Sequence, residues 1–411
     1  MFKKIIGIAV LIIAVLILAG GARKWKTNHP IINNAVSPIS NTAPAQSSST
    51  LPANKLLKNF KLLQSNSAAH SFWSPSDPNL LVIDKADSTQ YYQLYYLKTD
   101  GELLSSLTKG HPDITQRNNG WPEWDPKDQY IVFQSEEPEH FQDNLKWLAF
   151  PGLGFYSNLW ATDIKGGKFW KLTNVQYANT NIFQLVRAVV NPMFSSGGDK
   201  LYWTERYARG GYLNWGKWQV KQADFVRSTD GPKLANEKVV LRAEDVCSKC
   251  NYVVNMGIYS DGSTMVVAGN LDGQHVYGMD QYLLNLNTKK LTNLTNTTEN
   301  WEEGSCLSPD NKQIVYSTDI DSALKLDFDD ADWSHQPKEK EYWIMNSDGS
   351  AKQRLTYFNK PGLSEYSGMK TITAECAFSP SGNKFAGIVG YDKSTTPTKT
   401  AFELNVGLFE F

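Results

Sequence analysis

The chain lacks an excess of charge of either sign. Its 41 Lys and Arg residues nearly balance its 42 Asp and Glu residues, which leaves a formal net charge of −1 over 411 residues. A protein that recognises nucleic acid or an anionic surface through its overall field carries a basic excess. We therefore expect no nucleic-acid partner.

Short catalytic and metal-binding motifs are also lacking. The chain has no Gly-x-Ser-x-Gly sequence, which forms the nucleophile elbow of α/β-hydrolases. Its six histidines are scattered, without the His-Glu-x-x-His spacing of zinc enzymes. These absences predict that the protein is not an enzyme, with no catalytic residue, no cofactor and no metal ligand set. A lyase-like site built from one or two of the histidines is the alternative.

Cysteine is scarce, with four residues in the chain. Cys247 and Cys250 form a lone Cys-Ser-Lys-Cys, and one such pair cannot complete a tetrahedral zinc site. In an oxidising compartment a small disulfide loop is the better prediction for this pair. Cys306 and Cys376 stand two and three residues before their turns and should point to different faces of the pleat, so we expect both to be buried, unpaired thiols.

The N-terminus carries an uncharged apolar run from Ile5 to Gly21, with basic residues on both sides. Its length is near the minimum for a bilayer span and also fits a signal peptide. Residues 1–26 are therefore a single-pass transmembrane anchor, which we favour, or a signal helix; both place the remainder outside the cytoplasm. Residues 27–54 are rich in Ser, Pro and Asn and predict a disordered linker, which leaves residues 55–411 for the folded domain.

Beyond residue 55 the chain repeats one unit six times. Each unit has a short strand that mostly ends in an aromatic residue, a Ser-Pro-Asp-Gly-like turn and a hydrophobic strand. The turn residues supply the backbone angles and local hydrogen bonds of a tight hairpin. The copies read FWSPSDPNLLVI from Phe72, PEWDPKDQYIVF from Pro122, PMFSSGGDKLYW from Pro192, GIYSDGSTMVVA from Gly257, SCLSPDNKQIVY from Ser305 and CAFSPSGNKFAG from Cys376.

Most copies are followed by a second hairpin that ends near Leu-Thr, as in EYWIMNSDGSAKQRLT from Glu341. Two hairpins make four antiparallel strands, which is one blade of a β-propeller. The sixth copy lacks its Leu-Thr strand, whereas a spare strand, KNFKLLQ, stands at Lys58 to Gln64. We predict an all-β fold, a six-bladed β-propeller in which the N-terminal strand closes the last blade and removes the exposed sheet edges.

The turns and second hairpins resemble the repeat of TolB-type β-propellers, part of the wider WD-repeat-like group, over roughly residues 57–411. The third and fourth copies depart from it, because Ser195-Ser196-Gly197 and Ser260-Asp261 lack the proline. The resemblance implies a protein-binding scaffold in the cell envelope. It indicates the fold more strongly than the function, since propellers host both enzymes and adaptors.

The innermost strand of each blade should line the central channel. Small residues stand three positions before the turns, as crowding near the axis requires. Just before them come polar and aromatic residues, which we expect to ring one mouth of the channel as a binding site, unless they only hydrogen-bond neighbouring blades: His70, Trp121, Asn191, Asn255, Glu303 and Glu375, with Glu302 adjacent.

The insertions offer two further candidates. The acidic stretch from Asp319 to Asp332 could hold calcium through carboxylate oxygens, although a solvated loop fits it better because the spacing of an EF-hand is missing. Aromatic residues in the second and third units predict an exposed surface for partners or sugar rings, with burial between blades as the alternative: Trp147, Tyr207, Tyr212, Trp215 and Trp218.

These features together predict a membrane-anchored or secreted, monomeric, extracytoplasmic propeller that acts as a scaffold for one or more envelope proteins. A propeller that binds carbohydrate or the cell wall is the first alternative. A propeller hydrolase or lyase is the second.

Overall fold

The computed structural model describes residues 56–65, 67–138, 147–175, 187–210, 215–330, 336, 338–395 and 401–411. The predicted transmembrane or signal helix and the linker lie outside these ranges. Within the ranges, no helix is both long and apolar enough to cross a membrane.

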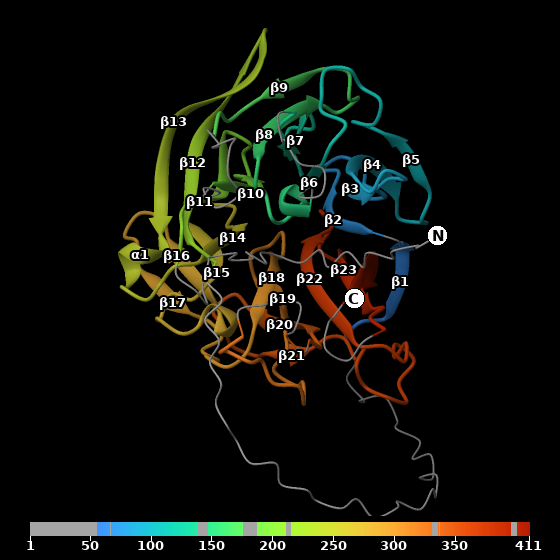
Figure 1. Cartoon of the computed structure of the whole chain (residues 1–411), viewed down its shortest axis with the longest axis vertical. Helices are drawn as coiled ribbons and strands as arrows, with labels where there is room; N and C mark the ends of the chain where they lie inside the picture. The colour runs from blue at the N-terminus through green and yellow to red at the C-terminus, as the bar shows by residue number, and fades with distance from the viewer. Residues whose placement is uncertain are drawn as a thin grey trace, which may run out of the picture.

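Six four-stranded antiparallel sheets surround a central axis, which confirms the predicted six-bladed β-propeller (Figure 1). We number the sheets blade 1 to blade 6. From the axis outwards, blade 1 consists of β2 (Ala68–Trp73), β3 (Leu80–Ala86), β4 (Tyr92–Lys98) and β5 (Leu103–Ser106). Blade 2 consists of β6 (Asn119–Trp124), β7 (Tyr130–Glu136), β8 (Ser157–Asp163) and β9 (Phe169–Lys171). Blade 3 consists of β10 (Ala188–Phe194), β11 (Lys200–Ala208), β12 (Lys217–Ser228) and β13 (Gly231–Arg242).

Blades 4 to 6 complete the ring. A short helix, α1 (Ala243–Val246), precedes blade 4, and a 3₁₀ turn, η3 (Val276–Gly278), lies inside it. These blades consist of β14 (Val253–Ile258), β15 (Thr264–Gly269), β16 (Asp280–Asn285) and β17 (Leu291–Asn293); β18 (Glu302–Leu307), β19 (Gln313–Thr318), β20 (Glu341–Asn346) and β21 (Gln353–Arg354); and β22 (Thr371–Phe378), β23 (Lys384–Asp392) and β24 (Phe402–Glu410).

The outermost strand of blade 6 comes from the start of the domain. Strand β1 (Asn59–Gln64) pairs antiparallel with β24, with Phe60 opposite Phe409. Figure 1 shows β1, in blue, beside the red strands of blade 6. The predicted closure by the N-terminal strand is therefore confirmed, and β1 covers the edge that β24 would otherwise expose.

The second strand of each blade explains the continuous apolar runs in the sequence. Both faces of this strand are covered by neighbouring blades, so apolar residues stand side by side instead of alternating with polar ones. Fully buried examples from blades 1, 2 and 5 are Leu81, Val82, Ile83, Ile131, Val132, Phe133, Ile314, Val315 and Tyr316.

Every innermost strand carries a register shift at the same depth, three to five residues before its turn. A bulge of this kind places an extra residue against its partner strand and turns a side chain to a new direction. Three bulge residues have the left-handed backbone that such a kink demands: Trp121 (φ 49°), Asn191 (φ 53°) and Gly304 (φ 68°). The bulges, more than the strands themselves, decide which side chains face the axis.

Cys306 and Cys376 form a disulfide that joins the innermost strands of blades 5 and 6, β18 and β22. The expectation of two unpaired thiols is wrong. No register shift lies between either cysteine and its turn, so the two side chains do take opposite faces of their strands. Neighbouring blades pack through opposite faces, however, so this placement brings Cys306 and Cys376 together instead of keeping them apart. A second disulfide joins Cys247 to Cys250.

The two disulfides should differ in their contribution to stability. They close loops of sequence separation 70 and 3, and the chain-entropy account assigns about 4 kcal/mol to the longer loop and about 2 kcal/mol to the shorter. We expect Cys306→Ala/Cys376→Ala to lower the free energy of unfolding by more than Cys247→Ala/Cys250→Ala does. Denaturant unfolding of both double variants checks this, and equal losses would contradict it.

Candidate functional site

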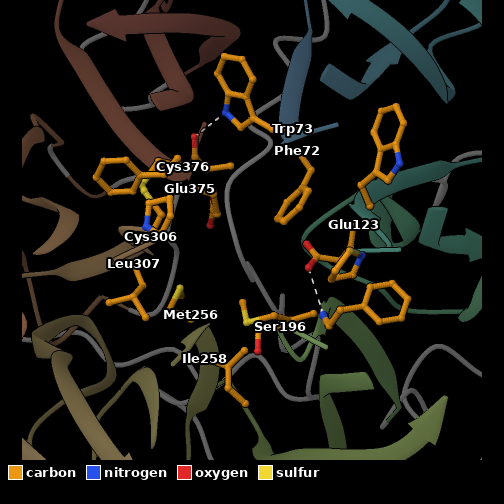
Figure 2. Close-up of a pocket in the computed structure, with 18 of the residues that line it drawn as sticks. Phe72, Trp73, Glu123, Ser196, Met256, Ile258, Cys306, Leu307, Glu375 and Cys376 are labelled. Carbon is orange, nitrogen blue, oxygen red and sulfur yellow. Dashed lines mark hydrogen bonds between the residues drawn. A yellow bond between two sulfur atoms is a disulfide. The ribbon is translucent and has the colours of Figure 1, made fainter. Parts of the chain in front are cut away.

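A cavity of about 490 Å³ lies on the propeller axis, and we call it the axial cavity. All six innermost strands contribute to its wall, which runs from the bulges to the turns that follow these strands. Figure 2 shows Phe72 and Glu123 on one side of this cavity and Cys306, Glu375 and Cys376 on the other.

At the bulge end the cavity is covered above blades 1 and 2. A Cβ atom built on Gly152 would lie 3.3 Å from the Trp121 ring and 3.7 Å from His70 Nε2. A Cβ atom on Gly120 would lie 2.2 Å from the Pro151 side chain. The segment before β8 therefore packs directly on the bulges of these two blades.

A buried carboxyl group positions His70 in this wall. Asp84 is fully buried on β3, opposite the bulge of β2. Its Oδ1 accepts the His70 backbone N–H at 3.1 Å, and its Oδ2 lies 2.8 Å from His70 Nδ1. Oδ2 also accepts the Trp121 backbone N–H from blade 2 at 2.7 Å. The His70 ring stacks on Trp121, with ring centroids 4.1 Å apart.

This arrangement leaves Nε2 of His70 as the ring nitrogen for a ligand. Since a carboxylate accepts hydrogen bonds, its contact with Nδ1 favours the tautomer with the proton on Nδ1. Burial disfavours the charged ring, but the charge and hydrogen bond of Asp84 outweigh burial, and the pKa of His70 is raised above 6.5. Glu375 adds to the rise.

Two carboxyl groups share the cavity wall with His70. Both carboxyl oxygens of Glu375 are buried without a hydrogen-bond partner. Burial raises the pKa of Glu375, although the charges of His70 and Lys340 oppose the rise. Burial likewise raises the pKa of Glu123 well above its ordinary value, even though Glu123 Oε1 accepts the Phe194 N–H at 3.1 Å. Both groups are therefore held towards the protonated form, which can donate a hydrogen bond.

A second buried cluster lies within electrostatic reach of Glu375. Glu303 accepts hydrogen bonds from Tyr252 Oη at 2.8 Å and from Trp301 Nε1 at 2.9 Å. Burial and the charge of Glu375 raise the pKa of Glu303 to about 7. Lys340 lies over the Trp301 ring, 5.1 Å from its centroid, and burial lowers its pKa against the attraction of Glu303 and neighbouring acids.

The structure places some of the predicted channel-mouth residues in the wall of the axial cavity and others outside it. Four of its members line the axial cavity: His70, Trp121, Asn191 and Glu375. Asn255, Glu302 and Glu303 are buried but are not part of the cavity wall. Asn255 bonds Thr204 Oγ1 at 2.6 Å, and Glu302 accepts a hydrogen bond from Thr318 Oγ1 of its own blade at 3.2 Å.

The offset from the turn explains this division. The four residues of the cavity wall stand four positions before their turns, whereas Asn255 and Glu303 stand five positions before theirs. In blades 4 and 5 the register shifts fall at Met256 and at Gly304–Ser305, so Met256 and Ser305 face the cavity where Asn255 and Glu303 were expected. The sequence reasoning also missed Asp84 and Glu123. Asp84 is a lone acid inside the apolar run LLVID of β3, and that signal was available.

The predicted aromatic surface needs a correction. Trp215 and Trp218 are 4% and 0% exposed and pack in the core with Tyr252. Trp218 belongs to β12, and the Trp215 ring also contacts the rings of Tyr277 and Trp301. Tyr207 is half-buried and donates to Glu244, Trp147 is half-buried, and Tyr212 lies outside the described residues.

The candidate calcium stretch is described only in part, since Asp332 lies outside the described ranges. Within them, Asp319 accepts hydrogen bonds from Asn300 Nδ2 and from the Trp301 N–H. In the part of the chain that the structure describes, no three His, Cys, Asp or Glu side chains come close enough to hold a metal ion.

Part of the chain is similar in sequence to a family of lyases. The model of the family described as oligogalacturonate lyase matches residues 221–357, about a third of the chain. An oligogalacturonate lyase of Dickeya dadantii (strain 3937) is 29% identical over 108 residues, which are 26% of this chain and 27% of that enzyme. The chain thus matches only about a quarter of its curated relative.

Solved propellers resemble the chain over most of its length at low identity. TolB of Acinetobacter baumannii has a TM-score of 0.46 at 16% identity, over 83% of this chain and 63% of that one. An oligogalacturonate lyase in complex with manganese has a TM-score of 0.45 at 12% identity, over 86% and 93%.

The prediction that the protein is not an enzyme is wrong, because the family match and the curated relative both name a lyase. The absence of hydrolase and zinc motifs had excluded only the enzyme classes that use those motifs. Titratable side chains that separate blades contribute to one site lie far apart in the sequence, so they form no short motif.

Buried acids of the propeller should make its stability depend on pH. Burial raises the pKa of Glu302 from 4.5 to about 8. Its contribution to the free energy of unfolding is therefore complete below about pH 4.5 and is lost as the pH rises through about 8. Glu302→Gln cannot ionise, so its stability should fall less over this interval, by up to about 1.4 kcal/mol per unit of pKa shift removed.

Urea unfolding at several pH values measures this effect. Glu102→Gln, which changes an exposed carboxyl group in an ion pair with Lys98, serves as the control. Identical pH dependence in the wild type and Glu302→Gln would show that Glu302 ionises normally in the folded protein.

Proposed function

We propose that the protein is a lyase that cleaves a uronate-containing oligosaccharide by β-elimination in the axial cavity. The observation that carries the proposal is the match of residues 221–357 to the oligogalacturonate lyase family, supported by the relative from Dickeya dadantii. The cavity adds a site with the acid–base groups that this chemistry needs. The proposal takes the place of the protein-binding scaffold as the main function.

β-Elimination from a uronyl unit requires three things. A base removes the proton from the carbon next to the carboxyl group, and the new carbanion charge spreads onto the carboxyl oxygens. A donor stabilises that charge, and an acid protonates the glycosidic oxygen as its bond to the neighbouring carbon breaks. The products are a shortened sugar with a free hydroxyl group and an unsaturated uronyl unit.

His70 suits the role of the base. Asp84 holds Nδ1 and fixes the ring orientation, so Nε2 presents its lone pair. The stack on Trp121 restricts the ring further, and the Trp121 face offers an apolar plane on which a sugar ring can rest.

Glu375 and Glu123 suit the other two roles. A protonated Glu375 donates a hydrogen bond to the carboxyl oxygen that gains charge, and its buried oxygens have no competing partner. A protonated Glu123 gives its proton to the departing glycosidic oxygen, while His70 keeps the proton taken from carbon. After the products leave, solvent takes the proton from His70 and returns a proton to Glu123, which restores the starting protonation.

A second part of the proposal concerns the cellular location of the protein. We propose that residues 1–26 hold the propeller on the extracytoplasmic side of a membrane, as the TolB-type repeat also implies, and that its partner there is a glycan.

Removal of the base should abolish most of the activity. We expect His70→Ala to lower kcat/KM for oligogalacturonate, its methyl ester, or both by at least about 100-fold. The ultraviolet absorbance of the unsaturated product follows the reaction. Glu341→Gln, which changes a buried carboxyl group of blade 5 outside the axial cavity, should retain activity. A wild-type protein that forms no unsaturated product from either substrate would refute the proposal.

The rate should also report the ionisation of His70. A base works in its unprotonated form, so kcat/KM should rise with pH through the pKa of His70, which is raised above 6.5. Asp84→Asn removes the charge that raises this pKa, and we expect the rising limb to move to lower pH while the maximal rate falls. A limb that stays in place would contradict the assignment of His70.

A further inference from the structure

The wall of the axial cavity has a one-sided set of ionisable groups. Among the described residues that line it, the carboxyl groups of Glu123 and Glu375 face the cavity together with His70, and none is a Lys or an Arg. A site built for a polyanion usually places a guanidinium or an ammonium group against each carboxylate. The described wall of the axial cavity instead carries two carboxyl groups and no guanidinium or ammonium group.

The buried cation near the cavity does not supply the missing charge. Lys340 is 3% exposed and is not part of the cavity wall. It lies over Trp301, and its charge already interacts with four acids of the protein: Glu303, Asp319, Glu375 and Glu302. A ligand carboxylate would have to compete with these four acids for one cation.

A resident metal ion does not fit the described residues either. The lyase solved in complex with manganese suggests that a cation can serve related propellers. Here the axial cavity offers one histidine and two separated glutamates, and no three ligating side chains come together in the described ranges. We therefore route no step through a metal.

A free uronate would meet a high cost in this cavity. Its carboxylate would lie beside Glu375, whose buried oxygens have no donor of their own. An ionised Glu375 would repel that carboxylate by about 4 kcal/mol at 4 Å and an effective dielectric constant of about 20, so the free uronate can bind only while Glu375 holds its proton. Removal of the carboxylate from water without a paired cation adds to this cost.

An ester of the same uronyl unit avoids both costs. It carries no charge, and its carbonyl oxygen can accept the hydrogen bond that a protonated Glu375 donates. Its small alkyl group would also find an apolar wall, since Met256, Ile258 and Leu307 line the cavity next to one another in Figure 2. Esterification further makes the neighbouring C–H more acidic, which lowers the demand on His70.

We propose that the axial cavity accepts a neutral uronyl ester, such as the methyl ester, in preference to the free uronate. This inference rests on the proposed function and names the substrate class of the same site. The bonds that break are the same as for the free uronate, namely the C–H bond and the glycosidic C–O bond, because the ester group stays intact.

The test compares trigalacturonate with its fully methyl-esterified form. Calorimetry measures binding to the His70→Ala variant, and ultraviolet absorbance measures turnover by the wild type. We expect the ester to bind at least about tenfold more tightly, because the carboxylate of the free uronate must leave water without a paired cation. Equal affinity, tighter binding of the free uronate or binding of neither would overturn the inference.

Turnover separates the two proposals. Preferred binding of the ester without any unsaturated product would sink the lyase function but leave the binding preference intact. Turnover of the free uronate with equal or higher kcat/KM would support the lyase and overturn the substrate class.

A variant on the rim tests the electrostatic cause. Ser196 is exposed and lines the cavity, as Figure 2 shows. Ser196→Lys adds the cation that the wall lacks, so the preference for the ester should shrink by at least about threefold. Ser196→Gln is the matched neutral control and should keep the wild-type preference. An unchanged preference in the lysine variant, with both variants folded by circular dichroism, would contradict the electrostatic account.

Discussion

The candidate site depends above all on the buried carboxyl group of Asp84. It accepts the backbone N–H of His70 in its own blade and that of Trp121 in the next, and it holds the His70 ring through Nδ1. A buried carboxyl group without such donors would be costly, so each of these bonds helps to fix the other two. The join between blades 1 and 2 and the position of the candidate base are therefore one structural feature.

Similar polar contacts join other blades at the same depth. Thr204 on β11 bonds Asn255 on β14, and Ser317 on β19 donates to the carbonyl oxygen of Thr373 on β22. In each case a side chain from the second strand of one blade reaches the innermost strand of the next, close to its bulge. Three joins, those after blades 1, 3 and 5, thus share one kind of contact, and among these three the blade 1 join uses a carboxyl group and has a histidine beside it.

The sequence predicted the ring better than the site. Turns, hairpins and the spare strand at Lys58 to Gln64 are local patterns, and they specify six blades and the closure with β24. The bulges have no comparable local signal, and one extra residue changes which side chain faces the axis. The cavity wall contains Met256 where Asn255 was expected, and the bridge between Cys306 and Cys376 was missed because neighbouring blades pack through opposite faces of their strands.

The function was harder to predict because its groups are dispersed. His70 and Glu375 were predicted at the channel mouth and Glu123 was not, and only the ring brings the three residues from blades 1, 2 and 6 to one cavity. Burial raises the pKa of both glutamates, whereas Asp84 raises the pKa of His70 against the effect of burial. A lone sequence displays neither effect. The buried aromatic residues Trp215 and Trp218 illustrate the same limit, since exposure also depends on how an insertion folds back.

A crystal structure of the His70→Ala variant with a methyl-esterified digalacturonate tests the central claim most directly. The account predicts the disaccharide in the axial cavity, with its ester carbonyl oxygen within hydrogen-bonding distance of Glu375 and a sugar ring against Trp121. A disaccharide bound at the opposite end of the ring or on the outer strands, with the axial cavity empty, would contradict it.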